Sequence, residues 1–318
     1  MNSSTTSATT PSSPWQRWTY ALKPASWPKL LVPTLFGQVL GVVSSGTFQL
    51  SAAFLGLAFT LFGLGFIVLL NDWGDRAVDS VKREMFPSGS PKTIPDQILS
   101  AAAVGTAGVA LGLATLLVAG GSEVLLHRRW AFEAGVTCMA IFAAYTLPPV
   151  RLNYRGGGEM LEMLGVGVAL PLYNAYLQAG FLDPSLSMWV VGFAFLSLAS
   201  GVASGLSDEE SDRRGGKRTL ASVFGNKVAR SVTEASVVVG ALAWLSGAFF
   251  EPSSFPSWAV ALAIAIVAWR FVGMRRLSSD AVTNAFEAQR RYKHFLHSAI
   301  WHSTAIAALL LWLDMVVS

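Results

Sequence analysis

The sequence predicts an all-α integral membrane protein with nine transmembrane helices around a central cavity. Of its 318 residues, 53% are hydrophobic and only 13% are charged, whereas a typical soluble domain has roughly 25% charged residues. Apolar stretches near the length of about 20 residues that a helix needs to cross a bilayer recur along the chain. The composition therefore excludes an ordinary soluble enzyme, and the single cysteine, Cys138, excludes a disulfide framework.

The predicted spans follow a polar N-terminal segment. Residues 1–14 contain nine Ser or Thr residues and no apolar run, so we expect a disordered tail there and a single membrane-embedded domain over residues 15–318. The nine predicted spans are 28–48, 51–70, 97–119, 131–147, 159–179, 187–206, 231–250, 257–274 and 298–317. The Gly and Pro residues inside them are tolerated because transmembrane helices pack closely through small residues.

The distribution of basic residues predicts the orientation of the chain in the membrane. When each Lys or Arg is assigned to the nearest connection, 21 of the 23 lie on one side of the nine spans. Cytoplasmic connections of membrane proteins are enriched in Lys and Arg. We therefore predict a multi-pass protein of the cell (inner) membrane with a cytoplasmic N-terminus and an external C-terminus. The basic charge then belongs to loops, and we expect no nucleic-acid partner.

An acidic motif, NDWGDRAVD at residues 71–79, follows the second apolar stretch. Asp72, Asp75 and Asp79 are spaced so that they share one face of a helix. Three carboxylates on one face repel each other unless a cation lies among them, and Mg²⁺ prefers oxygen ligands such as carboxylates and substrate phosphates. The motif therefore predicts a magnesium site at the membrane boundary. A solvated helix end is the alternative.

A second acidic motif follows the sixth apolar stretch. Asp208 and Asp212 lie four residues apart, and Lys217 and other basic residues come soon after them. Carboxylates and cations side by side can hold Mg²⁺ and a diphosphate from both directions, although a charged loop would have the same composition. Both motifs follow even-numbered spans, so we expect them on the same side of the membrane, in two halves that face each other across a cavity.

These residues carry a family resemblance. NDWGDRAVD resembles the NDxxDxxxD motif of the UbiA-type intramembrane prenyltransferases, and DEESD followed by RRGGKRTL resembles their second motif. The resemblance extends over residues 15–317 and includes the entry segment KPASWPKLLVP. The segment YTLPPVRLNYRGGGE, residues 145–159, looks most like the 1,4-dihydroxy-2-naphthoate prenyltransferase branch of menaquinone biosynthesis.

The resemblance implies a UbiA-like fold and Mg²⁺-dependent transfer of a prenyl group from an isoprenyl diphosphate to an acceptor. Asp72, Asp75 and Asp79 would hold one Mg²⁺, and Asp208 and Asp212 a second one. The residues that we expect to contact the substrates are Asn71, Lys82, Lys92, Tyr145, Arg151, Glu159 and Lys217. For Tyr145, a place in the interfacial aromatic belt is the alternative.

The acceptor is predicted to be a hydrophobic aromatic compound held near Glu159, similar to a quinone precursor such as 1,4-dihydroxy-2-naphthoate. The three glycines before Glu159 would let the backbone approach a flat ring, although they would also suit a tight turn. The same fold would suit a non-aromatic lipid or tetrapyrrole acceptor, or terpene cyclisation. A cation-coupled transporter is an alternative of a different class, but transporters place such carboxylates near the bilayer midplane.

Overall fold

The computed structural model describes residues 11–251 and 253–317, and the regular structure in these ranges is helical. The α-helices in these ranges are α1 (Pro14–Leu22), α2 (Pro28–Ser45), α3 (Leu50–Met85), α4 (Ala101–Leu126), α5 (Ala131–Thr146), α6 (Gly158–Leu164), α7 (Leu170–Ala179), α8 (Ser187–Ser204), α9 (Glu209–Arg214), α10 (Leu220–Phe224), α11 (Asn226–Phe250), α12 (Ser257–Ser278) and α13 (Phe286–Val317). A π-helical turn, Gly165–Ala169, joins α6 to α7 in one continuous segment.

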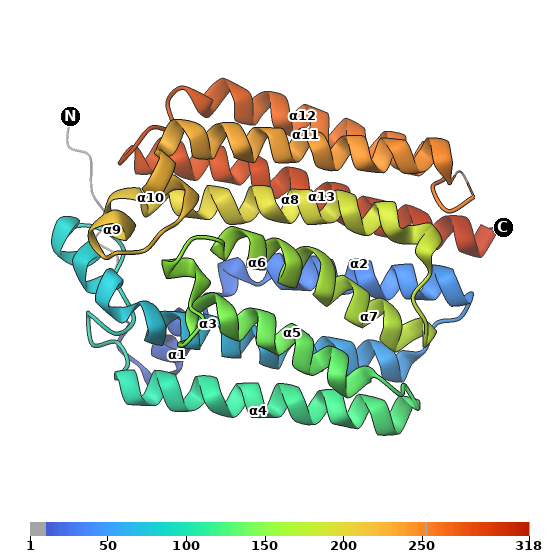
Figure 1. Ribbon diagram of the computed structural model, residues 1–318, viewed down its shortest axis with the longest axis horizontal. Coiled ribbons are helices and arrows are strands. Elements are labelled where there is room, and N and C mark those ends of the chain that lie inside the picture. The colour runs from blue at the N-terminus through green and yellow to red at the C-terminus, as the bar shows by residue number, and fades with distance from the viewer. Residues whose placement is uncertain (1–10, 252, 318) are drawn as a thin grey trace.

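The long helices run side by side and alternate in direction (Figure 1). The short helices α9 and α10 lie at one end of this bundle, together with the last turns of α3, and the C-terminus lies at the opposite end. Both acidic motifs therefore lie at the same end of the bundle, as their position after even-numbered spans predicts. We call this end the motif end.

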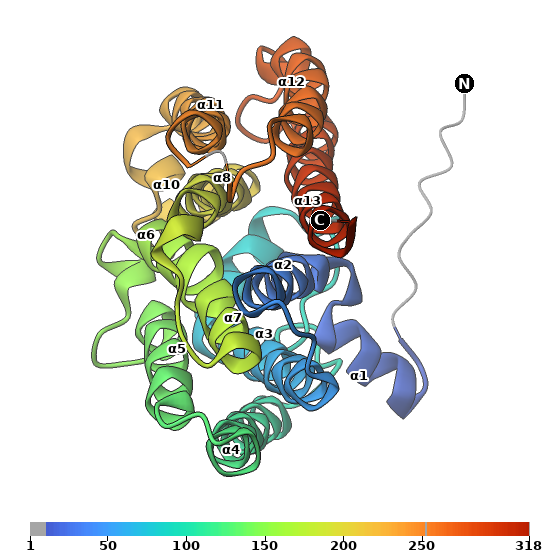
Figure 2. The ribbon, with the colours of Figure 1, turned by 90° about the vertical axis from the view of Figure 1, so that its right-hand side faces the viewer.

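The bundle consists of two helix groups with α2 and α7 between them. One group contains α8, α11, α12 and α13, and the other contains α3, α4 and α5 (Figures 1 and 2). Each group has its own apolar cluster, the first including Trp189 and Trp244 and the second Phe59 and Tyr173, and both clusters include residues of α2 and α7. The central pair therefore connects the two halves.

Glycine lets the central helices α2 and α7 approach each other closely. A Cβ atom on Gly37 would lie 2.2 Å from the carbonyl oxygen of Pro171, and one on Gly41 would lie 2.4 Å from that of Ala175. The two glycines are four residues apart, a spacing common at transmembrane helix contacts. Beside them, the buried amide of Gln38 donates a 2.8 Å hydrogen bond to Asn174, so polar groups also join the pair.

Among the described residues, seven helical segments are long and apolar enough to cross a membrane. They correspond to the second, third and fifth to ninth predicted spans, and the protein is an integral membrane protein. The first and fourth predicted spans form α2 and α5, which are not among these seven segments. Helix α5 has only 16 residues, and α2 has 18 residues but is less apolar than the seven. The count of nine spans therefore stays a prediction.

Several helices begin or end at other residues than the predicted spans do. Helix α3 continues to Met85, well past the predicted span end at residue 70, and α13 begins at Phe286 instead of residue 298. Hydropathy detects the apolar part of a helix and misses its polar turns beyond the bilayer. At the N-terminus, Ser13 caps α1, so helix begins inside the segment predicted as a tail; residues 1–10 of that segment lie outside the described residues.

Candidate active site

Helix α3 positions the first acidic motif. Its continuation beyond the apolar part holds Asp72, Asp75 and Asp79 on one face, and Asp72 and Asp75 are only 4% and 5% exposed. Asn71 turns toward α5, where its side-chain oxygen accepts a 2.6 Å hydrogen bond from the Thr146 hydroxyl. The motif therefore lies in protein surroundings, and the predicted alternative of a solvated helix end is wrong for these two carboxylates.

A lysine is paired with each of four carboxylates in the two motifs. Lys23, between α1 and α2, forms an ion pair with Asp72, and Lys82 forms one with Asp208. The ammonium of Lys92 lies 2.6 Å from Asp79, and that of Lys217 lies 2.7 Å from Asp75. Lys82, Lys92 and Lys217 were predicted substrate contacts, and the structure brings all three to the motifs.

The ion pairs join the two motifs across the bundle. Lys82 belongs to α3 but binds Asp208 of the second motif, and Lys217 follows the second motif but binds Asp75 of the first. Lys82 also donates a 3.0 Å hydrogen bond to the backbone carbonyl of Ser207. The structure therefore brings the predicted residues of the two motifs together in one site, through ion pairs between residues 126 and 142 positions apart in the sequence.

The two carboxylates of the second motif differ in their ease of ionisation. Burial raises the pKa of Asp212 to about 7, helped by the nearby charges of Asp208 and Asp75 and opposed by Lys217. For Asp208, burial acts in the same direction, but Lys82 and Lys92 outweigh it, and its pKa lies below the ordinary value. Two neighbouring carboxylates whose pKa values diverge in this way are typical of functional sites.

The loop between α3 and α4 covers the first motif. The hydroxyl of Thr93 donates a 2.7 Å hydrogen bond to Asp72, and Lys92 binds Asp79. The hydroxyl of Tyr20 in α1 donates a 2.7 Å hydrogen bond to the backbone carbonyl of Pro91. Burial lowers the pKa of Lys92, but the charges of Asp79 and Asp208 raise it more, so this ammonium stays charged.

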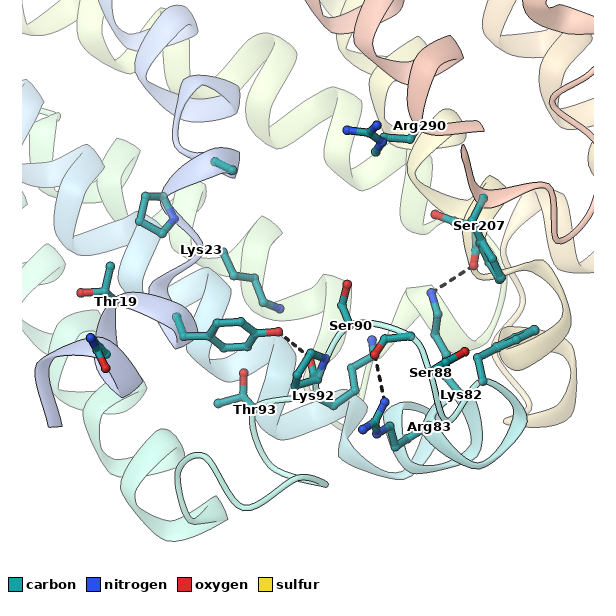
Figure 3. A pocket seen from close by; sticks show the side chains of 18 of the residues that line it. Thr19, Lys23, Lys82, Arg83, Ser88, Ser90, Lys92, Thr93, Ser207 and Arg290 are labelled. Atoms are coloured by element: carbon teal, nitrogen blue, oxygen red, sulfur yellow. Dashed lines mark hydrogen bonds between the residues drawn. The ribbon is translucent and has the colours of Figure 1, made fainter. Parts of the chain in front are cut away.

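A large cavity of about 1040 Å³ opens between α1, the short segment that precedes α2, the end of α3, this loop and the start of α13. Figure 3 shows the side chains of Lys23, Lys82 and Lys92 entering it from different parts of the chain. The basic residues that line this cavity, which we call the cationic chamber, are Lys23, Lys82, Arg83, Lys92, Arg290 and Lys293. Its lining is rich in ammonium, guanidinium and hydroxyl donors, so it suits a multiply charged anion.

Arg151 and Tyr154 form the opposite edge of the first motif. The guanidinium of Arg151 donates a 2.9 Å hydrogen bond to the backbone carbonyl of Gly74 and lies 3.6 Å from the ring centre of Tyr154. The Tyr154 hydroxyl in turn donates a 2.8 Å hydrogen bond to Asp75. The predicted Arg151 therefore reaches the motif, although it supports the backbone and Tyr154 and contacts no carboxylate.

Several site residues were not expected from the sequence. Lys23 and Tyr154 contact the acidic motif directly, and Thr93 donates to Asp72. Lys23 belongs to the entry segment KPASWPKLLVP, and Tyr154 to the segment at residues 145–159. Both segments were recognised as motifs, but no periodicity relates these residues to carboxylates far away in the sequence.

A smaller pocket of about 200 Å³ lies next to the chamber, and Lys23 lines both. Its walls are mostly apolar, with the predicted residues Asn71 and Tyr145 among its polar members. We call this the inner pocket, and its full lining is Lys23, Lys29, Leu30, Ile67, Val68, Asn71, Ile141, Phe142, Tyr145, Leu161, Glu162 and Val166. Tyr145 therefore lies at a pocket inside the bundle.

Glu159 does not line either cavity. Its carboxylate accepts a 2.6 Å hydrogen bond from the backbone N–H of Leu220 and so ties the start of α6 to the start of α10. The preceding Gly156 and Gly157 have φ of +87° and +113°, a conformation that strongly favours glycine. The glycines therefore form a tight turn, which the sequence left open as an alternative. Contact between Glu159 and an acceptor stays a prediction.

The side chains fit magnesium without forming a complete cage. Within the described ranges, no three His, Cys, Asp or Glu side chains gather closely enough to hold a metal ion by themselves. Mg²⁺ is commonly bound through one or two carboxylates and keeps its other positions for water and substrate phosphates. Buried Asp72, Asp75 and Asp212, together with the partly exposed Asp79 and Asp208, provide this incomplete oxygen set as the candidate ligands.

Relatives of known identity share this sequence at low identity. The chain is 23% identical over 302 residues to the chloroplastic chlorophyll synthase of Arabidopsis thaliana, covering 92% of this chain and 75% of the relative. It is 31% identical over 171 residues to the 1,4-dihydroxy-2-naphthoate octaprenyltransferase of Mycobacterium leprae, covering 53% of this chain and 56% of the relative.

The fold is similar to that of solved structures. A UbiA homolog from Archaeoglobus fulgidus, bound to GPP and Mg²⁺, superposes with a TM-score of 0.66 at 18% sequence identity, covering 92% of this chain and 99% of the other. The family model described as the UbiA prenyltransferase family matches residues 30–312, a range that includes both acidic motifs. The chain is a membrane-embedded enzyme that belongs to the UbiA prenyltransferase family.

Proposed function

We propose that this protein transfers a prenyl group from an isoprenyl diphosphate to an aromatic acceptor and that the transfer requires Mg²⁺. The observation that carries the proposal is the set of four lysine-paired carboxylates, three of whose lysines (Lys23, Lys82 and Lys92) line the cationic chamber. A diphosphate needs both kinds of group, since cations bind its oxygens directly and carboxylates bind it through a metal ion. The Archaeoglobus fulgidus homolog, bound to GPP and Mg²⁺, supports this assignment.

The chemistry of prenyl transfer explains the charge of the chamber. The allylic C–O bond breaks, and its electron pair leaves on the diphosphate. The carbocation-like centre that remains forms a bond to a ring carbon of the acceptor, which then loses a proton. When bound, Mg²⁺ would neutralise the charge that develops on the leaving diphosphate. We assign Asp72, Asp75 and Asp79 to one ion and Asp208 and Asp212 to a second.

The basic residues of the chamber complete this stabilisation. Lys82 and Lys92 of the chamber would turn from carboxylates to diphosphate oxygens, as would Lys217 beside the first motif, and Lys23 lies at the boundary with the inner pocket. The apolar walls of the inner pocket would shield the cationic carbon from water. Arg151 would hold Tyr154 and the backbone of the first motif in place.

The inner pocket supports a small aromatic acceptor. A volume of about 200 Å³ suits one or two fused rings better than a tetrapyrrole macrocycle. The 1,4-dihydroxy-2-naphthoate octaprenyltransferase of Mycobacterium leprae is among the relatives, so a naphthoate is our first choice and would place the protein in menaquinone biosynthesis. A transporter is disfavoured because the carboxylates lie at the motif end of α3, not at the middle of the bundle.

The proposed location is the cell (inner) membrane with the motif end toward the cytoplasm. The excess of Lys and Arg in the connections at this end supports it. Residues 15–318 would then form one membrane-embedded prenyltransferase domain.

An assay with the purified protein in lipid nanodiscs tests the proposal. Geranyl and geranylgeranyl diphosphates would be combined with 1,4-dihydroxy-2-naphthoate, hydroxybenzoates and phenols, and products would be identified by mass spectrometry. We expect a prenylated aromatic product with Mg²⁺ and none with excess EDTA. Product formation that survives EDTA, or transfer only to lipid or tetrapyrrole acceptors, would contradict the proposal.

A further inference from the structure

The inner pocket contains an ion pair that the diphosphate site does not use. The ammonium of Lys29 in α2 lies 2.5 Å from the carboxylate of Glu162 in α6, and both side chains are largely buried, at 24% and 13% exposed. Lys29 also donates a 3.2 Å hydrogen bond to the hydroxyl of Ser204 in α8. The pair therefore lies where three helices meet, inside an otherwise mostly apolar cavity.

Stability alone does not account for this pair. Removing two charges from water costs about as much as their attraction returns, so a buried ion pair is often no better for stability than apolar residues of the same size. Ionisable groups inside the membrane-embedded part of a protein usually mark a substrate pathway or binding site. The pair is also next to open space, because it lines the cavity directly.

Glu162 lines the inner pocket with hydrogen-bonding capacity that the protein does not fill. Its Oε1 atom is buried and pairs with Lys29, and no hydrogen bond to it has good geometry. Gly201 of α8 lies opposite; a Cβ atom there would be 3.1 Å from the carboxylate carbon. Only glycine therefore lets the carboxylate pack this closely against α8, and a donor would reach Glu162 from the inner pocket, which Glu162 lines.

The pair is also correctly placed relative to the diphosphate site. Lys23 lines both the chamber and the inner pocket, and it binds Asp72 of the first motif. A prenyl diphosphate with its diphosphate in the chamber would thus have its reactive carbon near the mouth of the inner pocket. A molecule held by Lys29 and Glu162 in that pocket would present its ring to this carbon.

We propose that Lys29 and Glu162 are the acceptor-recognition residues and that they select a hydroxylated aromatic acid. The Glu162 carboxylate accepts a hydrogen bond from the acceptor hydroxyl, and Lys29 binds the acceptor carboxylate, while the apolar walls hold the ring. This inference rests on the proposed function and adds to it the functional groups of the acceptor and the residues that read them.

The test compares acceptors that differ by one functional group. In nanodiscs with Mg²⁺ and geranyl diphosphate, 1,4-dihydroxy-2-naphthoate would be compared with 1,4-dihydroxynaphthalene, and 4-hydroxybenzoate with phenol. Losing a hydrogen bond to a charged group corresponds to about a tenfold to a hundredfold effect. Lys29→Met should therefore raise KM by this factor for the two acids and leave KM nearly unchanged for their partners without a carboxylate, whereas Glu162→Gln should raise KM for all four.

Two controls separate recognition from a structural role. Glu133→Gln removes an exposed carboxylate of α5 and should change no KM. The exchanged pair, Lys29→Glu with Glu162→Lys, keeps an ion pair between α2 and α6. If the pair only stabilises the fold, the exchange restores activity toward the acids; if it recognises the acceptor, the exchanged protein folds, binds geranyl diphosphate with Mg²⁺ as the wild type does, and stays inactive.

The outcomes distinguish this inference from the proposed function. If the wild type prenylates no aromatic compound, the proposed function itself fails. If the wild type prenylates the acids but Lys29→Met affects acids and their carboxylate-free partners equally, only the inference is overturned. Recovery of activity in the exchanged pair would overturn it as well.

Discussion

The carboxylate of Asp72 illustrates how this site is built one residue at a time. One of its oxygens binds Lys23 and the other accepts the Thr93 hydroxyl, so three separate parts of the chain meet on one side chain. Asp75 is similarly surrounded by Lys217 and Tyr154. Each partner stabilises a buried carboxylate charge that would otherwise be costly. A metal ion that binds the carboxylate would take the place of these partners.

Substitution of either acidic motif should abolish turnover without unfolding the protein. Asp72→Ala and Asp208→Ala each remove a proposed metal ligand, and losing such transition-state stabilisation costs about 3 kcal/mol or at least ~100-fold in kcat. The measurement is product formation from geranyl diphosphate with Mg²⁺, with thermal unfolding as a check of the fold. Asp314→Asn, near the opposite end of α13, is the matched control. Near-normal kcat in a folded Asp72→Ala protein would disprove the two-metal site.

The raised pKa of Asp212 predicts a pH dependence. Its folded-state pKa of about 7 exceeds the ordinary value of 3.8, so the stability that its protonated form contributes is complete below the ordinary pKa and is lost as the pH rises through about 7. Metal ligands must be ionised. The rise in Tm caused by Mg²⁺ with geranyl diphosphate should therefore grow between about pH 6 and about pH 8.

Asp212→Asn provides the comparison for this pH series. Its Tm without ligands should fall less across the same pH range, because the asparagine does not ionise. A ligand-induced rise in the wild type that is the same at both pH values would contradict the assignment of Asp212 to the metal site.

The sequence predicted the carboxylates of the site but not all of their partners. The spacing of Asp72, Asp75 and Asp79 is visible because one helix repeats it. Lys23 meets Asp72 only because α1 and α2 fold back over α3, and a contact across 49 residues has no local signature. Lys82 and Lys217 were predictable as cations near the motifs. That each pairs with a carboxylate of the other motif, Lys82 with Asp208 and Lys217 with Asp75, depends on tertiary structure.

At the scale of helices, the sequence located the apolar segments better than the helix ends. Hydropathy changes at residue 70, where α3 leaves the apolar region, yet the helix continues because residues 71–85 contain no Pro and few strong helix breakers. Helix α4 begins at Ala101 and not at residue 97, where the predicted span begins, for a local reason. The Ser100 hydroxyl accepts a hydrogen bond from the backbone N–H of Ala103 and caps the helix there. Bilayer thickness determines the apolar length, and caps determine the helix length.

The contact between α2 and α7 predicts a strong effect of one methyl group. Gly37→Ala would bring Cβ within 2.2 Å of a backbone oxygen, which cannot move aside as a side chain would, so overpacking should cost about 1–3 kcal/mol. In α4, a Cβ on Gly121 would meet nothing within 4 Å, and alanine is the better helix former.

Thermal unfolding in detergent checks this pair of variants. Gly37→Ala should lower Tm clearly, and Gly121→Ala should leave it unchanged or raise it slightly. An equal Tm for the two variants would show that α2 and α7 do not pack as closely as described.

At the scale of the whole molecule, the bundle presents one strongly basic end. The nine predicted traversals place the N-terminal helix α1 and the C-terminus at opposite ends (Figure 1). Alternation of basic and neutral connections along the whole chain was the feature that made this arrangement predictable, because a missed or added span would exchange the two sides beyond that point.

Cysteine labelling can measure the orientation directly. The native Cys138 is only 2% exposed, so it should not react and need not be removed. Ser253→Cys and Ser279→Cys place exposed thiols just before and just after α12. In intact cells, a membrane-impermeant maleimide should label the first, and it should label the second only after permeabilisation. The reverse pattern would invert the topology, and labelling of both in intact cells would mean that α12 does not span.

The lysine–carboxylate pairs have a thermodynamic consequence for the order of substrate capture. A metal ion that enters alone must displace ammonium groups and leave them without counter-ions, whereas a diphosphate that arrives with it gives those ammonium groups new partners. Mg²⁺ and prenyl diphosphate should therefore bind with positive heterotropic cooperativity, each strengthening the affinity for the other by the same factor. Without substrate, the lysines and carboxylates of the site are each other's counter-ions. They change partners favourably only when the metal ion and the diphosphate bind together.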